Sequence, residues 1–396
     1  MRSQLTRLWG SVLLVSLGLH ALSACSAGTT RGTPVTVPHE STGPVITISE
    51  PPVIDVSESP ATPTPTPTPS ASGATATASA SASAGPTATP TSAATVADAS
   101  LCTGWTTTTL VSGLGVLESV LLDPNGNGTL VSSTSGNAVN RISASGTSTQ
   151  VAALTAPGEL VQLTNGKILV STGDSTEDAL TDMANGTVVI LDPVTGKTQT
   201  YSTGLVAPNG VAVDAAGNVY TTDTGTVTGI TRVSATNPTQ PQSMWAPVTD
   251  SNGIAIDNAK RLLYVDQTFS ATNDIEVLSL DAPQSVSLLV SLTGIGSPVP
   301  KGLDDMILDP TGILDVAANL SGEVFRVDPA TGYACVLASG FALTSSVALE
   351  HGPPYGLLVV GFDGSLHQLV PPSPTTLSPS EKANRPSLPF PFLRGG

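Results

Sequence analysis

The feature that most constrains this chain is a pattern of short strands that recurs six times between residues 117 and 370. In each copy a short apolar strand ends in a turn, a second strand follows that Gly usually opens, and a third strand of alternating character comes after another turn. The second strands read GTLVSST (128–134), GKILVST (166–172), GNVYTTD (217–223), RLLYVDQ (261–267), GILDVAA (312–318) and GLLVVGF (356–362). A repeat of about 40 residues built only from strands is typical of a β-propeller, with one sheet per blade. We therefore expect an all-β, six-bladed β-propeller with a central channel and a rim of loops.

The repeat also predicts which side chains face the channel, because equivalent residues of successive blades lie at one height around the axis. One polar residue recurs at the start of each first strand. These residues are Glu118, Glu159, Asn209, Asn252, Asp304 and Ser346. Five of the six have a carboxylate or amide oxygen, and such hard donors fit calcium, which accepts about six to eight oxygen ligands in irregular geometry. The alternative is that these side chains serve turn and strand-entry chemistry alone.

Two other kinds of site are excluded by what the chain lacks. The predicted propeller has only His351 and His367, both in the sixth blade and off the ring, so too few ligands exist for a His-based zinc site. No G-x-S-x-G motif is present, which excludes a serine hydrolase of that type.

Two cysteines of the predicted domain favour a disulfide. The sixth blade runs out of sequence after its third strand, so residues 105–111 (WTTTTLV) should supply the missing strand and close the ring. Cys102 precedes this strand, and Cys335 lies in YACVLAS, the expected fourth strand of the neighbouring fifth blade. Secretion makes a bond between them plausible. Two unpaired thiols are the alternative.

The N-terminus has the pattern of a bacterial secretion signal. Basic residues precede an apolar segment, 11–22, that is too short to span a bilayer as a mature helix. The segment ends in Leu22-Ser23-Ala24-Cys25, which resembles the lipobox in which the Cys is diacylated and becomes the new N-terminus. We expect Cys25 to be lipidated and the protein to be anchored to a cell membrane outside the cytoplasm. An ordinary signal peptide that happens to end in Cys is the alternative.

Composition divides the chain into four parts. Residues 1–25 are the expected lipoprotein signal peptide, and 26–100 form a linker rich in Pro, Thr, Ser and Ala that has almost no large apolar side chains and should be disordered. Residues 101–370 are the expected propeller, and 371–396 an expected disordered, Pro-rich tail. The net charge of −16 disfavours nucleic-acid partners. We expect a monomer whose partners are the membrane, through the lipid, and a small molecule at the channel.

Three segments make the chain resemble the SMP-30/gluconolactonase family. They are Pro208-Asn209-Gly210-Val211-Ala212-Val213-Asp214, Ser251-Asn252-Gly253-Ile254-Ala255-Ile256-Asp257 and Gly302-Leu303-Asp304-Asp305-Met306-Ile307-Leu308-Asp309. The third is also similar to the segment by which related phosphotriesterases present an Asp to a channel calcium. The resemblance implies a six-bladed propeller with one catalytic calcium held by Glu, Asn, Asn and Asp. Carried over residue by residue, these ligands are Glu118, Asn209, Asn252 and Asp304, with Asp304 also acting as nucleophile or general base.

The chain departs from this family at two positions. Ala207 stands where the family's sugar lactonases have an Arg, and Ser119-Val120 follow Glu118 where Gly-Pro is usual. We expect a calcium-dependent hydrolase of lactones or related esters, and the two departures put a sugar lactone in doubt as its substrate. A non-catalytic binding propeller displayed on a stalk is the alternative. Asp266 is expected in a turn, with a substrate contact as the alternative. The acidic insertion 174–182 is expected to be a solvated loop, with a lid or a loose cation site as the alternative.

Overall fold

The computed structural model describes residues 99–224, 229–350 and 352–373. The predicted signal peptide, Cys25, all but the end of the predicted linker, His351 and most of the C-terminal tail lie outside the described residues. No helix among the residues described is long and apolar enough to cross a membrane.

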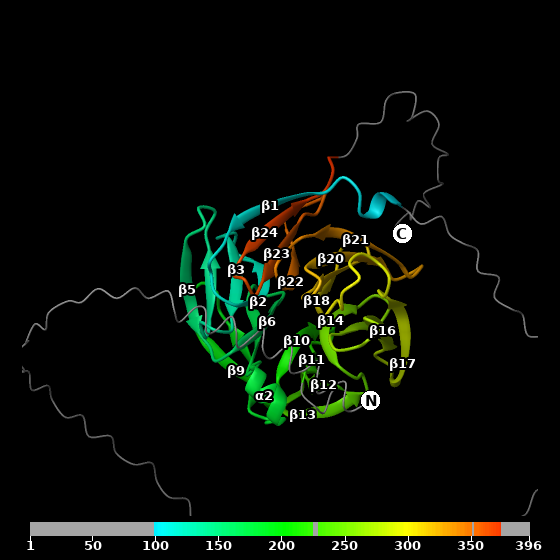
Figure 1. Cartoon of the computed structure of the whole chain (residues 1–396). Helices are drawn as coiled ribbons and strands as arrows, with labels where there is room; N and C mark the ends of the chain where they lie inside the picture. Colours follow the sequence, from blue (N-terminus) through cyan, green and yellow to red (C-terminus); the bar gives the residue numbers. More distant parts are fainter. Residues whose placement is uncertain (1–98, 225–228, 351, 374–396) are drawn as a thin grey trace, which may run out of the picture. The chain divides into compact units, whose positions relative to one another are not determined.

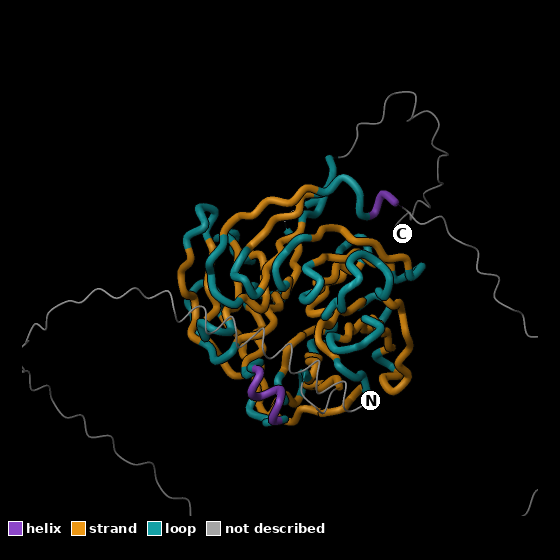
Figure 2. Tube along the Cα trace, viewed as in Figure 1, coloured by secondary structure: helices purple, strands orange, loops and turns teal. Residues whose placement is uncertain are grey.

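The described strands form six four-stranded antiparallel sheets, which confirms the predicted six-bladed propeller (Figures 1 and 2). The first three blades consist of β2 (Leu117–Leu122), β3 (Thr129–Ser133), β4 (Ala138–Ile142) and β5 (Ser148–Ala153); β6 (Pro157–Gln162), β7 (Ile168–Thr172), β8 (Gly186–Leu191) and β9 (Thr198–Leu205); and β10 (Pro208–Val213), β11 (Val219–Asp223), β12 (Gly229–Ser234) and β13 (Asn237–Ala246).

The other three blades consist of β14 (Ser251–Asp257), β15 (Leu262–Gln267), β16 (Asp274–Ser279) and β17 (Ala282–Ser291); β18 (Leu303–Leu308), β19 (Leu314–Ala318), β20 (Glu323–Asp328) and β21 (Tyr333–Ser339); and β22 (Thr344–Leu349), β23 (Leu357–Gly361), β24 (Leu366–Val370) and β1 (Thr106–Val111). Two short helices are also described, a 3₁₀ turn at Ala99–Leu101 and α2 at Thr176–Thr181.

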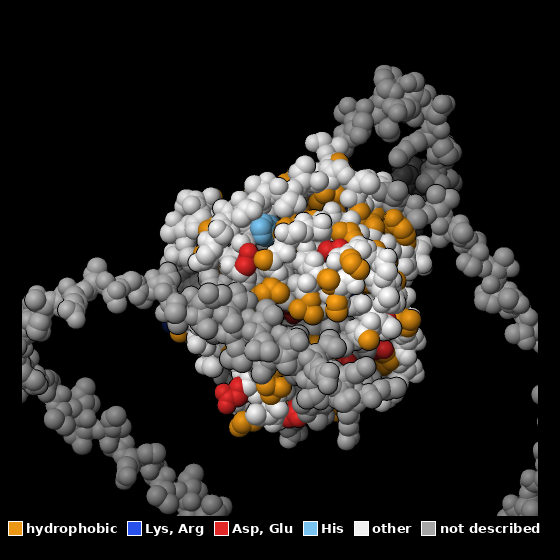
Figure 3. All heavy atoms as spheres, viewed as in Figure 1, with side chains coloured by type: hydrophobic (Ala, Val, Ile, Leu, Met, Phe, Trp, Pro, Cys, Tyr) orange, Lys and Arg blue, Asp and Glu red, His pale blue; other side chains and the backbone are white. Residues whose placement is uncertain are grey.

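The core lies between neighbouring blades. Most second strands are buried along their whole length, whereas the outermost strands are largely exposed. The two neighbouring blades cover both faces of a second strand. Its sequence is therefore an apolar run without the alternation of a half-exposed strand. Leu130, Leu160 and Val170, for example, pack together between blades one and two. Figure 3 shows acidic side chains scattered over one face without a single concentrated patch.

The sixth blade is closed by the N-terminal strand, as predicted. β1 pairs antiparallel with β24, from Thr106 opposite Val370 to Val111 opposite Leu366. The two strands lie side by side in Figure 1, although they come from opposite ends of the domain. Pairing the two ends of the domain completes the hydrogen bonding of a blade that would otherwise have three strands.

The predicted disulfide is present and ties this closure to the next blade. Cys102, just before β1, is bonded to Cys335 in β21, with 6.2 Å between the Cα atoms. The bond links residues 233 positions apart, so it constrains almost the whole propeller.

Replacing both cysteines by Ser should destabilise the propeller by about 2–5 kcal/mol, the usual contribution of a native disulfide in a secreted domain. Urea unfolding of the oxidised protein, of the reduced protein and of the double Ser variant checks this. The reduced protein and the variant should unfold at the same lower urea concentration. Coincident midpoints for all three samples would show that the bond does not stabilise the closure.

Candidate functional site

Every innermost strand has a register shift at the same place, close to its start. In blade one, Leu117 pairs with Ser133 while Val120 pairs with Val131, so two residues of β2 face one residue of β3. The same interruption occurs in β6, β10, β14 and β18, whereas in β22 a single residue, Ser345, lies between the paired residues Thr344 and Ser346. A bulge of this kind re-aims the side chains that it contains. The bulge therefore contains two consecutive residues of the inner strand in blades one to five and one residue in blade six.

Side chains of the second strand satisfy the backbone groups that the bulge leaves without a ladder partner. The N–H of Gly210 donates to Oγ1 of Thr222 at 2.8 Å, and this hydroxyl donates to the carbonyl of Asn252 in the next blade at 2.6 Å. In the same way, the N–H of Glu159 donates to Oγ of Ser171, and this hydroxyl donates to the carbonyl of Asn209. These bonds join neighbouring blades at the bulge and fix the backbone of both Asn residues.

The paired residues define the ring more strictly than sequence spacing does. In each inner strand one residue comes directly after the last pair that precedes the register shift. These residues are Glu118, Gly158, Asn209, Asn252, Asp304 and Ser345. Glu159 and Ser346 each lie one residue further along the strand than this position, so they do not share the height of the other four. They lie beside Asp305 instead, since Oγ of Ser346 donates to Oδ2 of Asp305 at 2.6 Å and the carboxyl of Glu159 interacts with that of Asp305. Repeat spacings vary among the blades, and a bulge makes two adjacent residues equally suitable as the polar marker, so spacing could not separate them.

The four predicted calcium ligands come together as two hydrogen-bonded pairs. Nδ2 of Asn209 donates to Oε1 of Glu118 at 3.3 Å. Nδ2 of Asn252 donates to Oδ1 of Asp304 at 2.9 Å, and Asn319 donates to the other Asp304 oxygen at 2.8 Å. All four predicted ligands are buried, between 3% and 9% exposed.

A fifth polar side chain, that of Asp174, joins this group. The same Nδ2 of Asn209 donates to its Oδ2 at 3.2 Å. Sequence reasoning placed Asp174 at the start of a solvated acidic loop, but the structure puts its carboxyl beside the ring. The sequence feature that could have indicated this is Gly158, because glycine leaves blade two without a side chain of its own at the ring.

The carboxyl groups of the site repel one another in a buried setting. Burial, followed by the nearby Asp174, raises the pKa of Glu118 well above its usual range. Burial and then Glu118 raise the pKa of Asp304, and burial and then Asp304 raise the pKa of Asp174 to about 8. Desolvation and like charge both disfavour the ionised forms. A bound cation would reverse this preference.

The donor set fits a calcium ion. Carboxylate and amide oxygens are the ligands that calcium accepts, and calcium tolerates the irregular geometry of residues drawn from different blades. Oδ1 of Asn252 is buried without a hydrogen-bond partner, as expected of an oxygen that lacks its ligand. Within the described ranges no group of three or more His, Cys, Asp or Glu side chains is arranged to hold a metal ion, so the two amides are essential to the set.

Asp266 lies in a strand rather than in the predicted turn. It is the fifth residue of β15, fully buried, and its Oδ1 accepts the N–H of Gly253 at 2.8 Å. It thus occupies the position that Thr222 holds in blade three. Burial raises the pKa of Asp266 to about 8, which favours a neutral carboxyl.

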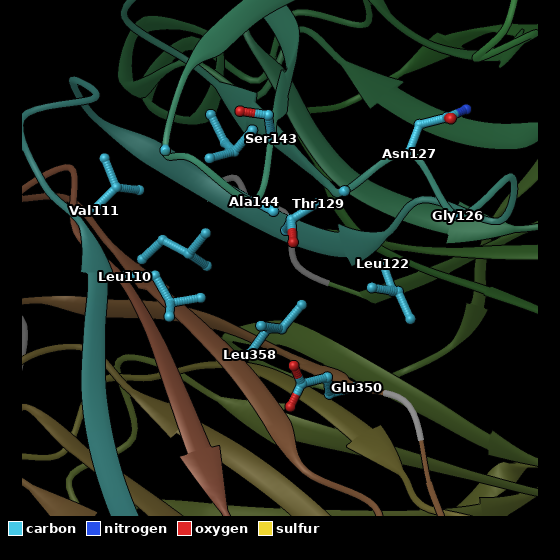
Figure 4. A pocket seen from close by; sticks show the side chains of 14 residues that line it. Leu110, Val111, Leu122, Gly126, Asn127, Thr129, Ser143, Ala144, Glu350 and Leu358 are labelled. Carbon is cyan, nitrogen blue, oxygen red and sulfur yellow. The ribbon is translucent and has the colours of Figure 1, made fainter.

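A hollow of about 640 Å³ lies away from the ring, between blades six and one (Figure 4). Its walls include the aliphatic side chains of Leu110, Leu122 and Leu358, with Glu350 at one side. This lining offers no converging set of oxygen donors. The buried ring is therefore the stronger candidate for chemistry.

Comparison with known families finds a match over most of the propeller. The family described as "SMP-30/Gluconolactonase/LRE-like region" matches residues 114–360. No curated protein matches the chain at a significant level.

Several solved structures share the fold. A gluconolactonase from Xanthomonas campestris is 16% identical with a TM-score of 0.55, covering 67% of this chain and 89% of its own. A luciferin-regenerating enzyme is 14% identical with a TM-score of 0.53, covering 69% and 96%. Regucalcin from Agrobacterium tumefaciens C58, described as a calcium-binding protein, is 18% identical with a TM-score of 0.50, covering 65% and 90%. At these identities the likeness shows the fold alone.

Proposed function

Because the chain belongs to the SMP-30/gluconolactonase/LRE-like family, we propose that it is a calcium-dependent hydrolase of lactones or related esters that acts at the channel ring. The observation that carries this proposal is that two buried hydrogen-bonded pairs, Glu118 with Asn209 and Asp304 with Asn252, lie close enough for the two carboxyls to interact electrostatically. A regucalcin with this fold is described as calcium-binding, which supports the choice of metal.

In this proposal Glu118, Asn209, Asn252 and Asp304 hold the ion, which when bound polarises the substrate carbonyl oxygen. Asp304 acts as nucleophile or general base on the same substrate. Two amides orient its carboxylate, since Asn252 donates to one oxygen and Asn319 to the other. Fixing the carboxylate in this way lowers the entropic cost of reaching the reactive geometry.

The surroundings of the ring favour neutral substrates. The described hydrogen bonds of Glu118, Asp174 and Asp304 involve amide groups, and none involves Lys or Arg. Ala207 is fully buried with a φ of 36°, so no basic side chain is available at the position where the family's sugar lactonases have Arg. A substrate with its own carboxylate would meet like charge from the acidic ring without a basic side chain to pair with it.

A calcium titration combined with a substrate panel tests the function. We expect turnover of at least one neutral lactone, aryl ester or phosphotriester in the presence of calcium, and its loss on chelation. Calcium binding with no turnover across the panel would favour the alternative, a binding propeller with a structural ion.

We further propose that Cys25 is lipidated and holds the protein at the outer face of a cell membrane. Cys25→Ala should move the protein from the membrane fraction to the soluble fraction, because one acylated residue supplies the anchor. Ser26→Ala is the matched control and should stay in the membrane fraction. Mass spectrometry of the mature N-terminus completes the test, and an unmodified chain that begins elsewhere would contradict the proposal.

A further inference from the structure

Blade two lacks a side chain at the ring position, because Gly158 stands where the other blades have Glu, Asn, Asp or Ser. A Cβ atom built on Gly158 would lie 2.7 Å from Oγ of Ser171 and 3.2 Å from Oδ2 of Asp174. The space that a ring side chain would enter is therefore already taken by the Asp174 carboxylate. The loop that follows the second strand of blade two has supplied an acid in place of the missing ring residue.

The backbone holds Asp174 in this place. The N–H of Asp174 donates to the carbonyl of Ala156 at 3.1 Å, and that of Gly173 donates to Thr155 at 3.1 Å, which ties the loop to the start of the inner strand. Gly173 has a φ of 79°, and a Cβ there would lie 2.9 Å from the Cα of Gly186. The turn therefore needs glycine. Directly after it, Ser175 caps α2 through the N–H of Asp178 at 3.1 Å.

Charge and hydrogen bonding connect Asp174 to the proposed calcium ligands. Its carboxylate repels those of Glu118 and Asp304, and the Asn209 amide bridges it to Glu118. With Asp174 the group has three carboxylates, from blades one, two and five, and two amides, from blades three and four. Among the described residues the three acids alone are not arranged to hold a metal ion, so the amides are needed in this set as well. The unpartnered Oδ1 of Asn252 lies in the same group and gives independent support for a missing ligand.

We propose that Asp174 is a fifth oxygen donor to the channel cation, supplied by the loop of blade two in place of a ring side chain. This inference rests on the proposed function, since it assigns a further residue to that calcium site. It raises the ionised donor charge from −2 to −3. More ligand charge raises calcium affinity, and a site rich in carboxylates and crowded with protein oxygens suits calcium better than magnesium.

Isothermal titration of the full chain with calcium tests this inference. Asp174→Asn should weaken binding about tenfold and Asp174→Ala about a hundredfold, because the first removes charge and the second also removes the oxygen. Glu177→Gln is the matched control, since it removes one exposed acid from the same loop region and should leave the affinity unchanged. Circular dichroism verifies that each variant is folded.

The possible outcomes separate the inference from the proposed function. If Glu118→Gln reduces calcium affinity while Asp174→Asn and Asp174→Ala bind as the wild type does, the calcium site stands and Asp174 is not a ligand. If Asp174→Asn retains wild-type affinity and only Asp174→Ala weakens binding, Asp174 merely orients the Asn209 amide and the inference is overturned. If the wild type binds no calcium, the proposed function itself fails.

Discussion

Removing calcium should lower the melting temperature of the propeller by about 8 °C or more near pH 8. An ion present at about a thousand times its dissociation constant stabilises the folded state by about 4 kcal/mol. For a domain of this size each kcal/mol corresponds to roughly 2 °C or more. The stabilisation arises because the ion neutralises carboxylates that repel one another in the buried ring.

The size of this shift should depend on pH in a defined direction. Burial and the neighbouring Asp304 raise the pKa of Asp174 from 3.8 to about 8, and the pKa values of Glu118 and Asp304 are also raised. A group whose pKa is higher in the folded state stabilises the fold below its unfolded pKa, and this contribution is lost as pH rises through the folded value. The metal-free protein should therefore lose stability from about pH 4 towards pH 8.

Calcium competes with the same protons, so its stabilising effect should be small near pH 5 and largest near pH 8. Differential scanning fluorimetry with calcium or with chelator, at four pH values across this range, measures both effects. A melting temperature that does not respond to calcium at any of these pH values would contradict the proposed ion site. A response of equal size at all of them would contradict the assignment of the raised pKa values to the ligands.

Asp304→Asn should abolish most of the hydrolytic activity while preserving much of the calcium binding. An amide oxygen can still bind the ion, but an amide cannot act as nucleophile or accept a proton, so we expect kcat to fall at least about a thousandfold. Calcium affinity should fall only about tenfold, because one ligand charge is lost and the oxygen is kept.

The variant also disturbs two hydrogen bonds in a predictable way. Asn252 and Asn319 each donate to one oxygen of Asp304, and an Asn side chain can accept from only one of them. Some loss of thermal stability should therefore accompany the loss of turnover. Asp281→Asn is a suitable control, because Asp281 is exposed and its ion pair with Arg261 contributes little. If Asp304→Asn retains full activity, Asp304 is not the catalytic residue.

The fold could be predicted because it is encoded by local patterns that repeat. Runs such as GKILVST and GLLVVGF identify second strands, and the shortage of a fourth strand in blade six identifies residues 105–111 as the closing strand. The pairing of Cys102 with Cys335 followed from that closure. Each of these inferences depended on chain order and strand period, which the sequence contains directly.

The site was only partly predictable, because it depends on bulges and on a loop. The bulge shifts the register of each inner strand near its start, so spacing could not decide between Gly158 and Glu159 or between Ser345 and Ser346. Asp174 comes from a loop whose path is set by backbone hydrogen bonds and by the space beside Gly158. Asp266 was expected in a turn just past the second strand of blade four, yet β15 includes it.

A crystal structure of the full chain grown with calcium tests the central claim most directly. We predict one ion in the channel, with oxygens of Glu118, Asn209, Asn252 and Asp304 at about 2.3–2.6 Å from it. Anomalous scattering would identify the ion as calcium. A channel without an ion at saturating calcium, or an ion bound away from these four side chains, would contradict the account.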